Sequence, residues 1–269
     1  MSEPRTNGRP TGAFPDFVLP VAIFIAAIAG WEAIVRINKI PPYLLPAPSL
    51  IGETIVKDWP LLSGSLWVTL KITFSALFLA IAGGLFLAIL FSQWKWVERS
   101  FFPFAVILQV TPVIAIAPLL LVYLDAQTAV LVCAFIVAFF PILSNTVLGL
   151  ASADHNLVEL YELYGASRWQ QLRLLRLPGA LPYFLGGLKI GGGLALIGAI
   201  VAEIAAGSAG QGTGLAFRIA EAGYRLNIPR MFAALVLISV TGIAIFLFFS
   251  ILSHVLLGRW HDSQRSRET

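Results

Sequence analysis

Few side chains in this sequence have the types and spacing that enzyme chemistry requires. The histidines His155, His254 and His261 do not stand at metal-ligand spacing, and no Ser/His/Asp or paired-carboxylate arrangement accompanies them. The glycine-rich run at 207–214 is not a phosphate loop, because no Lys-Ser or Lys-Thr follows it. The single cysteine, Cys133, cannot build a disulfide framework or a cysteine metal site. We therefore expect no catalytic residue, no metal and no cofactor.

The polar segment 154–182 has instead the pattern of a surface that docks on another surface. Asn156 followed by Glu159 predicts a capped helix start, and Gly165 predicts the end of that helix. Apolar and aromatic side chains recur at helical spacing and form one stripe: Leu157, Leu160, Tyr161 and Tyr164. Such a stripe needs a partner, which is either another protein or the apolar spans of the same chain.

A second short helix is predicted directly after this glycine. Ser167 is a suitable cap for it, and the helix extends to Arg176, where Leu177-Pro178 ends it. The segment is therefore predicted to form two short helices joined at a glycine.

Polar groups inside apolar blocks mark a second set of candidate positions, because they are costly in a bilayer. Glu203 lines a path, bonds across a subunit interface, or is simply a carboxylate that reaches water at the membrane boundary. Gln109, Thr111 and Asn145 add polar groups to neighbouring blocks, and Pro112 removes a backbone donor. A translocation path is one interpretation of these five residues, and kinks that only shape packing are the alternative.

The elements that must position these residues are membrane spans. Hydrophobic residues make up 58% of the 269 residues and charged residues 12%, against about 25% charged residues in soluble domains. The apolar residues form six blocks near or above the roughly 18 residues that suggest a span. The blocks lie at about 17–36, 66–92, 101–123, 128–150, 183–206 and 230–257. We expect an all-α polytopic membrane protein with about six transmembrane helices, in one domain at 17–257.

The placement of Lys and Arg predicts the orientation of these spans. The segments on the side of the N-terminus carry the larger share of the basic residues, which places both termini in the cytoplasm of a bacterial cell. The tails 1–16 and 258–269 and the segment 154–182 are then cytoplasmic. The net charge of +4 fits this bias, and no basic stripe with interleaved aromatics indicates nucleic-acid binding.

The first outward-facing segment is predicted to be only partly helical. Four prolines between Pro41 and Pro48 exclude a regular helix there. After Ser49 the apolar and charged residues alternate in the manner of a short helix that lies at the membrane interface.

The spacing within 154–182 resembles the EAA motif of ABC importer permeases. In that motif Glu-Ala-Ala is followed by three residues, Gly, nine residues, Ile, one residue and Leu-Pro. Glu159 stands at the Glu and Gly165 at the Gly, whereas Leu160 and Tyr161 replace the two alanines. The resemblance implies a coupling helix that sits in a groove of a cytoplasmic ATPase. The residues it assigns to this coupling are Glu159, Leu160, Tyr161, Tyr164, Gly165, Ala166, Leu175, Leu177 and Pro178.

The resemblance extends over nearly the whole chain and indicates a subgroup. The run Leu45–Ser49 is similar to a segment of the nitrate, sulfonate and taurine permeases. Further residues similar to that group are Pro112, Ala115, Ala117, Pro118, Leu119, Ala202, Glu203, Gly212 and Gly214. The chain is at least as similar to a related branch linked to pyrimidine precursors of thiamine.

The resemblance implies a non-catalytic permease subunit of an ATP-driven importer. It would pair with a second copy of itself, form the path of a small solute by alternating access, and receive that solute from a substrate-binding protein. The ATPase would be a separate chain, because this one has no Walker A sequence. Both a small anion, such as a sulfonate, nitrate or taurine, and a pyrimidine precursor of thiamine remain open as substrates.

Two other classes of protein are compatible with several apolar spans. A secondary transporter or channel needs no ATPase, but the apolar blocks offer few charged groups for ion coupling. A membrane-embedded enzyme would need clustered His, Asp or Glu in the spans, and the sequence has no such cluster.

Overall fold

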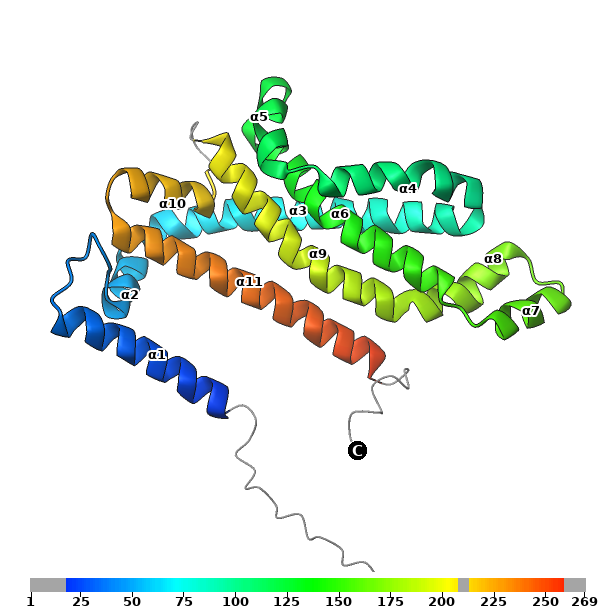
Figure 1. The fold of residues 1–269 in the computed structure, drawn as a ribbon, viewed down its shortest axis with the longest axis horizontal. Coiled ribbons are helices and arrows are strands. Elements are labelled where there is room, and N and C mark those ends of the chain that lie inside the picture. Colours follow the sequence, from blue (N-terminus) through cyan, green and yellow to red (C-terminus); the bar gives the residue numbers. More distant parts are fainter. Residues whose placement is uncertain (1–17, 208–212, 259–269) are drawn as a thin grey trace, which may run out of the picture.

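The computed structural model describes residues 18–207 and 213–258, and within these residues it contains helices and connecting turns (Figure 1). The predicted tails therefore lie, except for Gly258, outside the described residues. In chain order the helices are α1 (Val18–Ile37), α2 (Pro48–Lys57), α3 (Trp59–Gln93), α4 (Lys95–Val110), α5 (Val113–Tyr123), α6 (Ala126–Ala151), α7 (His155–Leu163), α8 (Arg168–Gln171), α9 (Leu177–Ala206), α10 (Leu215–Tyr224) and α11 (Ile228–Leu257). A π-helical turn, Leu172–Arg176, joins α8 to α9.

The predicted all-α membrane architecture is confirmed. By length and composition α1, α3, α6, α9 with its preceding turns, and α11 can each cross a membrane. Helices α4 and α5 pass the same test only when they are counted together as one sixth span. The chain bends by 99° between them.

The span predicted at 101–123 is therefore divided into two helices rather than one straight helix. The chain leaves the helical conformation at Thr111 (ψ 123°) and Pro112 (ψ 117°). A residue before proline disfavours the α conformation, and proline has no N–H for the helical ladder. Pro118, in contrast, lies inside α5 without ending it.

Helix α3 begins several residues before the predicted span at 66–92. Asp58 separates it from α2, and Pro60 lies in its first turn, where no helical N–H is required. Leu62 is fully buried there and packs with Ile51 and Leu215. The apolar block marks the part that fits a bilayer, whereas the helix extends further to cover this small cluster. The short helix predicted after Ser49 is α2.

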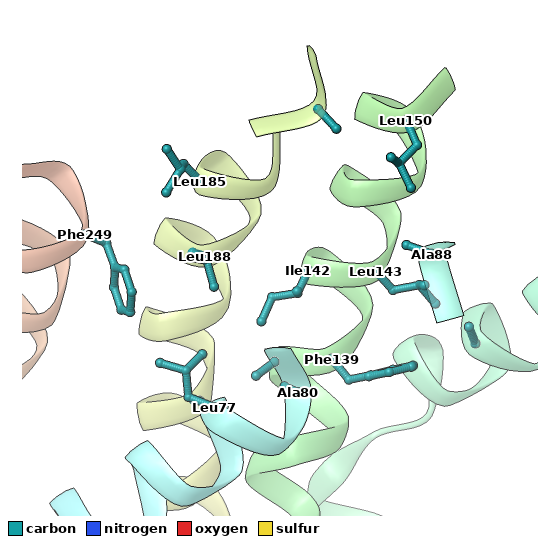
Figure 2. Packing of buried hydrophobic residues seen from close by; sticks show 14 of the residues in the cluster. Leu77, Ala80, Ala88, Phe139, Ile142, Leu143, Leu150, Leu185, Leu188 and Phe249 are labelled. Carbon is teal, nitrogen blue, oxygen red and sulfur yellow. The ribbon is translucent and has the colours of Figure 1, made fainter. Parts of the chain in front are cut away.

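The main core lies between α3, α6, α9 and α11 (Figure 2). Ile142 of α6 is fully buried at its centre. A methyl group at Gly191 would come within 2.8 Å of Ile142, and one at Gly192 within 2.7 Å of Phe249. Glycines at these positions let α9 approach α6 and α11 closely, as in other membrane helix pairs.

Helix α1 lies at the edge of the bundle (Figure 1) and has one buried residue, Val35. Its Glu32 carboxylate accepts hydrogen bonds from the backbone N–H of Ser49 at 3.0 Å and from its hydroxyl at 2.8 Å. Glu32 thereby satisfies a free N–H in the first turn of α2 and ties α1 to the rest of the chain.

Candidate functional site

Helix α7 is the element predicted to dock on a partner, and it lies with α8 at one end of the molecule (Figure 1). The predicted capping by Asn156 and Glu159 is wrong, because the Asp154 carboxylate caps the helix by accepting the Asn156 N–H at 2.8 Å. Asp154 offers an acceptor one position before the first helical residue, which is the preferred capping geometry. Glu159 instead lies 3.5 Å from His155 and is exposed.

The end of α7 is fixed by a glycine, as predicted. Gly165 has φ +71°, a conformation that costs other residues about 1–2 kcal/mol. The N–H of Ala166 donates to the carbonyl of Tyr161 at 2.9 Å, and that of Gly165 to the carbonyl of Glu162 at 2.9 Å. This pair of hydrogen bonds is a Schellman motif, which turns the chain sharply after the helix.

The second part of the segment begins as predicted but does not end as predicted. The Ser167 hydroxyl accepts the Gln170 N–H, and the Gln170 side chain accepts the Ser167 N–H, which forms a capping box. The helix then continues through the π turn into α9 rather than ending at Leu177-Pro178. Pro178 lies in the first turn of α9, and the wider π turn before it accommodates its missing donor and its ring. The docking segment is thus continuous with a long span.

The apolar stripe of α7 is not covered by the spans of its own chain. No residue of α7 is buried. Leu157 and Leu160 are exposed, Tyr164 is 84% exposed and Leu163, beside the stripe, is 85% exposed, while Tyr161 is half-buried. Of the two partners that the sequence allowed for this stripe, the described spans of the same chain therefore do not cover it.

The remaining residues assigned to coupling follow the Gly165 turn, near the start of α9. Leu175 and Leu177 are half-buried, and Leu177 packs against the main core. Pro178 is exposed. These residues connect the docking helix to the bundle, whereas Leu160 and Tyr164 face outward.

Glu203 lies at the opposite end of α9, in a buried polar cluster. Its side chain is buried (5% exposed) among protein groups, unlike a boundary carboxylate that only extends into water. It accepts the hydroxyl of Thr69 at 3.0 Å and the backbone N–H of Ala216 at 3.0 Å. The Thr69 hydroxyl in turn accepts the N–H of Leu215 at 2.9 Å. Side chains of α3 and α9 therefore cap the first turn of α10, where a negative group is favourable.

The close packing at this cluster requires a glycine. A methyl group at Gly214, the residue before α10, would overlap the Glu203 carboxylate. A pocket opens beside the cluster and is lined in part by Gln127, Phe217 and Glu203. Gly212, which with Gly214 is similar to residues of the nitrate, sulfonate and taurine permeases, lies outside the described residues.

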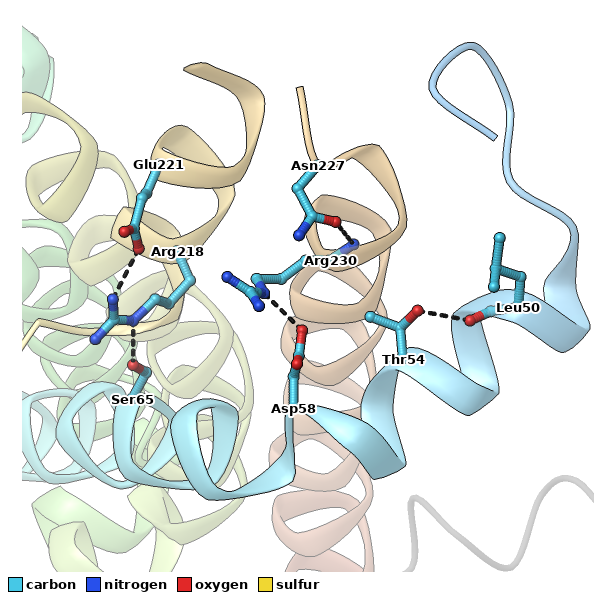
Figure 3. A network of polar contacts seen from close by, with 8 residues as sticks. All are labelled: Leu50, Thr54, Asp58, Ser65, Arg218, Glu221, Asn227 and Arg230. Atoms are coloured by element: carbon cyan, nitrogen blue, oxygen red, sulfur yellow. Dashed lines mark hydrogen bonds and ion pairs between the residues drawn. The ribbon is translucent and has the colours of Figure 1, made fainter. Parts of the chain in front are cut away.

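Charged pairs hold the same end of the molecule together (Figure 3). Arg218 of α10 donates to the Ser65 hydroxyl at 2.9 Å and pairs with Glu221 at 2.7 Å. Arg230 of α11 pairs with Asp58 at 2.6 Å. The hydrogen bond from Arg218 lowers the pKa of Glu221 below its ordinary value, against a smaller opposing effect of burial. Sequence reasoning missed Thr69, the contact of Arg218 with Ser65 and the pair of Arg230 with Asp58, because the partners are far apart in the chain.

The remaining path candidates do not join this cluster. Thr111 donates to the carbonyl of Ile107 at 2.6 Å, and Asn145 donates to that of Pro141 at 2.8 Å, so both bond within their own helices. Gln109 and Pro112 are exposed. A methyl group at Gly187 would lie 3.0 Å from Asn145, and Gly187 is about 24 Å along α9 from Glu203 at 1.5 Å per residue. Asn145 therefore lies far from Glu203 along the bundle.

Curated relatives of the chain are transport proteins. A riboflavin transport system permease protein of Chloroflexus aurantiacus is 32% identical over 97% of this chain and 96% of its own length. A formylaminopyrimidine transport permease protein of Halalkalibacterium halodurans is 34% identical over 91% and 96%. A putative aliphatic sulfonates transport permease protein of Bacillus subtilis is 31% identical over 94% and 89%.

Solved structures and a family model point to the same class. The MetNI methionine ABC transporter in an inward-facing conformation matches with a TM-score of 0.64 and 20% identity, over 74% of this chain and 97% of that one. An amino acid ABC transporter crystallised with histidines matches with a TM-score of 0.62 and 20% identity, over 77% and 97%. The model of the binding-protein-dependent transport system inner membrane component matches residues 80–260. The chain therefore belongs to the binding-protein-dependent transport system inner membrane components, as the multi-pass permease subunit of an ABC importer.

Proposed function

We propose that α7 is the coupling helix through which a separate ATPase drives this permease. The observation that carries the proposal is the uncovered apolar stripe of α7 on a segment that continues into α9. Because α8, the π turn and α9 form one path of helical backbone, a displacement of α7 is transmitted to the span whose other end holds Glu203. The coupling contacts are Glu159, Leu160, Tyr161, Tyr164, Gly165, Ala166, Leu175, Leu177 and Pro178.

In the proposed orientation the α7 end faces the cytoplasm and the α10 end faces outward. Lys95, Arg168, Arg173 and Arg176 gather in the turns near α7, which is the distribution of a cytoplasmic surface. Both termini are then cytoplasmic. A substrate-binding protein delivers its ligand to the end where α2 and α10 lie.

A second copy of this chain is the proposed partner within the membrane. Helix α1 has one buried residue, and α4 and α5 are largely exposed. Surfaces of this kind suit both lipid and a neighbouring subunit, and an alternating-access path requires two sets of spans that move against each other. Crosslinking of the purified chain to a dimer in the membrane would support this pairing, whereas a monomeric permease in the active importer would refute it.

A nitrogen heterocycle is the substrate class that the pocket beside Glu203 favours. Among the described residues that line it, the polar side chains are Gln127, Glu203 and Thr213, Phe217 is aromatic, and none is a lysine or arginine. A carboxylate and an amide beside an aromatic ring suit the donors of a flat ring better than they suit an anion. The relatives named for riboflavin and formylaminopyrimidine transport agree with this class.

A sulfonate or similar anion is the second candidate, because of Lys71. This lysine lines a neighbouring groove on α3 and α6 with Trp67 and Gln127. Competition for uptake into cells separates the two classes. Inhibition by a pyrimidine or flavin but not by taurine supports the heterocycle, and the reverse result supports the anion.

The coupling proposal is tested by purifying the ATPase with variants of the chain. Glu159→Ala should reduce the amount of ATPase that copurifies and abolish ATP-dependent uptake, because it removes the exposed carboxylate of α7 that stands at the Glu of the EAA motif. Glu53→Ala is the matched control, since Glu53 is an exposed glutamate on α2 at the other end. If both variants retain the ATPase and full uptake, α7 is not the coupling helix.

A further inference from the structure

A second pocket, near α7, is lined by none of the residues assigned to coupling. It opens between the turn that joins α3 to α4 and the segment that follows α7, and its volume together with the solvent at its mouth is about 930 Å³. Its lining comprises Ser92, Gln93, Trp94, Lys95, Trp96, Glu162, Arg168, Gln171 and Arg176. Three of these side chains are cationic and one is a carboxylate, so the pocket carries an excess of positive charge.

Two of the three cations of this pocket, Arg168 and Arg176, are available to a ligand. Lys95 pairs with Glu98 at 3.1 Å, and Glu98 is not part of the lining. Arg168 donates one N–H to the Gln93 carbonyl at 3.4 Å, which leaves further donors of its guanidinium for other acceptors. Neither Arg168 nor Arg176 forms an ion pair with a carboxylate in the part of the chain that the structure describes. Guanidinium groups bind phosphate oxygens well, because they present N–H donors in a planar fork.

The position of the pocket matches the headgroup layer of a membrane. The apolar span α3 ends at Gln93, one residue before Trp94. Trp94 and Trp96 are both exposed, and tryptophan is enriched at the boundary between lipid and water. Phe101 and Phe104 are exposed further along α4 and present an apolar surface to acyl chains. An amphiphile with an anionic head and an apolar tail fits this arrangement, in which a basic pocket adjoins a lipid-facing helix.

We propose that this pocket binds the headgroup of an anionic phospholipid, with Arg168 and Arg176 on the phosphate and the two tryptophans at its edge. The lipid bridges the α3–α4 turn and the segment between α7 and α9. Since that segment positions α7, a bound lipid helps to hold the docking helix in place. The proposal does not depend on which protein docks on α7.

Native mass spectrometry of the full chain in non-ionic detergent tests the proposal. The probes are phosphatidylglycerol and phosphatidylcholine with identical acyl chains. The unaltered chain should retain phosphatidylglycerol in preference. Arg168→Gln with Arg176→Gln should weaken that binding by about fivefold for each charge removed. Arg173→Gln is the matched control, because Arg173 is exposed on the same π turn but does not line the pocket; it should leave binding unchanged.

Three outcomes would overturn the proposal. The first is equal retention of the two lipids by the unaltered chain. The second is displacement of phosphatidylglycerol by millimolar inorganic phosphate, which would indicate a site for a free anion. The third is a double variant that keeps its lipid but loses the copurified ATPase, which would assign the pocket to the protein interface. The single variant Arg168→Gln, at an exposed position, should also weaken retention of phosphatidylglycerol. It leaves the half-buried Arg176 in place, so a folding defect of the double variant does not affect this comparison.

Discussion

Replacing Thr69 by valine tests the buried cluster that caps α10. Valine has nearly the shape of threonine, so the change removes the hydroxyl and leaves the packing of α3 intact. Thr69 is fully buried, and its hydroxyl makes two hydrogen bonds, one to Glu203 and one from the Leu215 N–H. The variant therefore leaves one buried donor without a partner and removes one donor from a carboxylate.

The expected cost follows from these two hydrogen bonds. An unpaired buried polar group costs about 1–3 kcal/mol, whereas hydrogen bonds between membrane helices average about 0.6 kcal/mol with a maximum near 1.7. The cluster lies at the end of the spans, so we expect a loss of about 2 kcal/mol for Thr69→Val. That loss corresponds to roughly a thirtyfold change in the unfolding equilibrium.

Thr73 supplies the matched control one turn further along α3. It is also fully buried, but its hydroxyl has no hydrogen-bond partner among the described residues. Thr73→Val should therefore be neutral or slightly stabilising. The assay is reversible unfolding of the purified chain in mixed micelles, followed by hydrogen exchange at Leu215 and Ala216. Equal effects of the two substitutions would refute the role of Thr69 as a cap.

Three further outcomes are expected from the geometry. Gly192→Ala should destabilise the chain by about 1–3 kcal/mol through overpacking. Gly193→Ala should be neutral or stabilising, because a methyl group there has no neighbour within 4 Å. The melting temperatures of the two variants test this difference. Gly165→Ala should lower the stability by about 1–2 kcal/mol because of the positive φ, and it should reduce copurification of the ATPase. A variant with unchanged stability and unchanged copurification would contradict the role of this turn. Glu221 contributes stability that is present above the ordinary glutamate pKa of about 4.3 and is lost as pH falls through its lowered pKa. Melting temperature should therefore fall less in acid for Glu221→Gln than for the unaltered chain, and identical pH profiles would exclude the pairing with Arg218.

Hydropathy predicted the long spans, because a bilayer imposes a length and an apolar composition on each of them. It did not predict the 99° bend between α4 and α5. The apolar residues on both sides of Pro112 fit a span equally well whether the helix is straight or broken. The bend depends on the local conformation of Thr111 and Pro112, which composition does not encode.

The docking segment was predicted in part, because its signals are local. Gly165 ends one helix and Ser167 caps the next, and each does so through residues within one helical turn. The structure confirms both predictions. The continuation past Pro178 was missed, because a proline ends a helix or begins one depending on the carbonyls before it. Here a π turn precedes it and α9 begins.

The surroundings of Glu203 were not accessible from the sequence. An ionisable residue in an apolar block indicates a special position, but it does not identify its partners. Thr69 and the N-terminus of α10 meet Glu203 only because α3, α9 and α10 pack together. Helix α10 was not predicted, since its ten residues are too short to stand out as a span.

Photocrosslinking at two tyrosine positions tests the central claim most directly. Tyr164 at the end of α7 is 84% exposed, and Tyr224 at the end of α10 is 91% exposed, so a photoreactive residue is accessible at either position. In the assembled importer, crosslinking from position 164 should capture the ATPase and change in yield when ATP is added. Crosslinking from position 224 should not capture it. Capture of the ATPase from position 224 but not from position 164 would contradict both the coupling role of α7 and the proposed orientation.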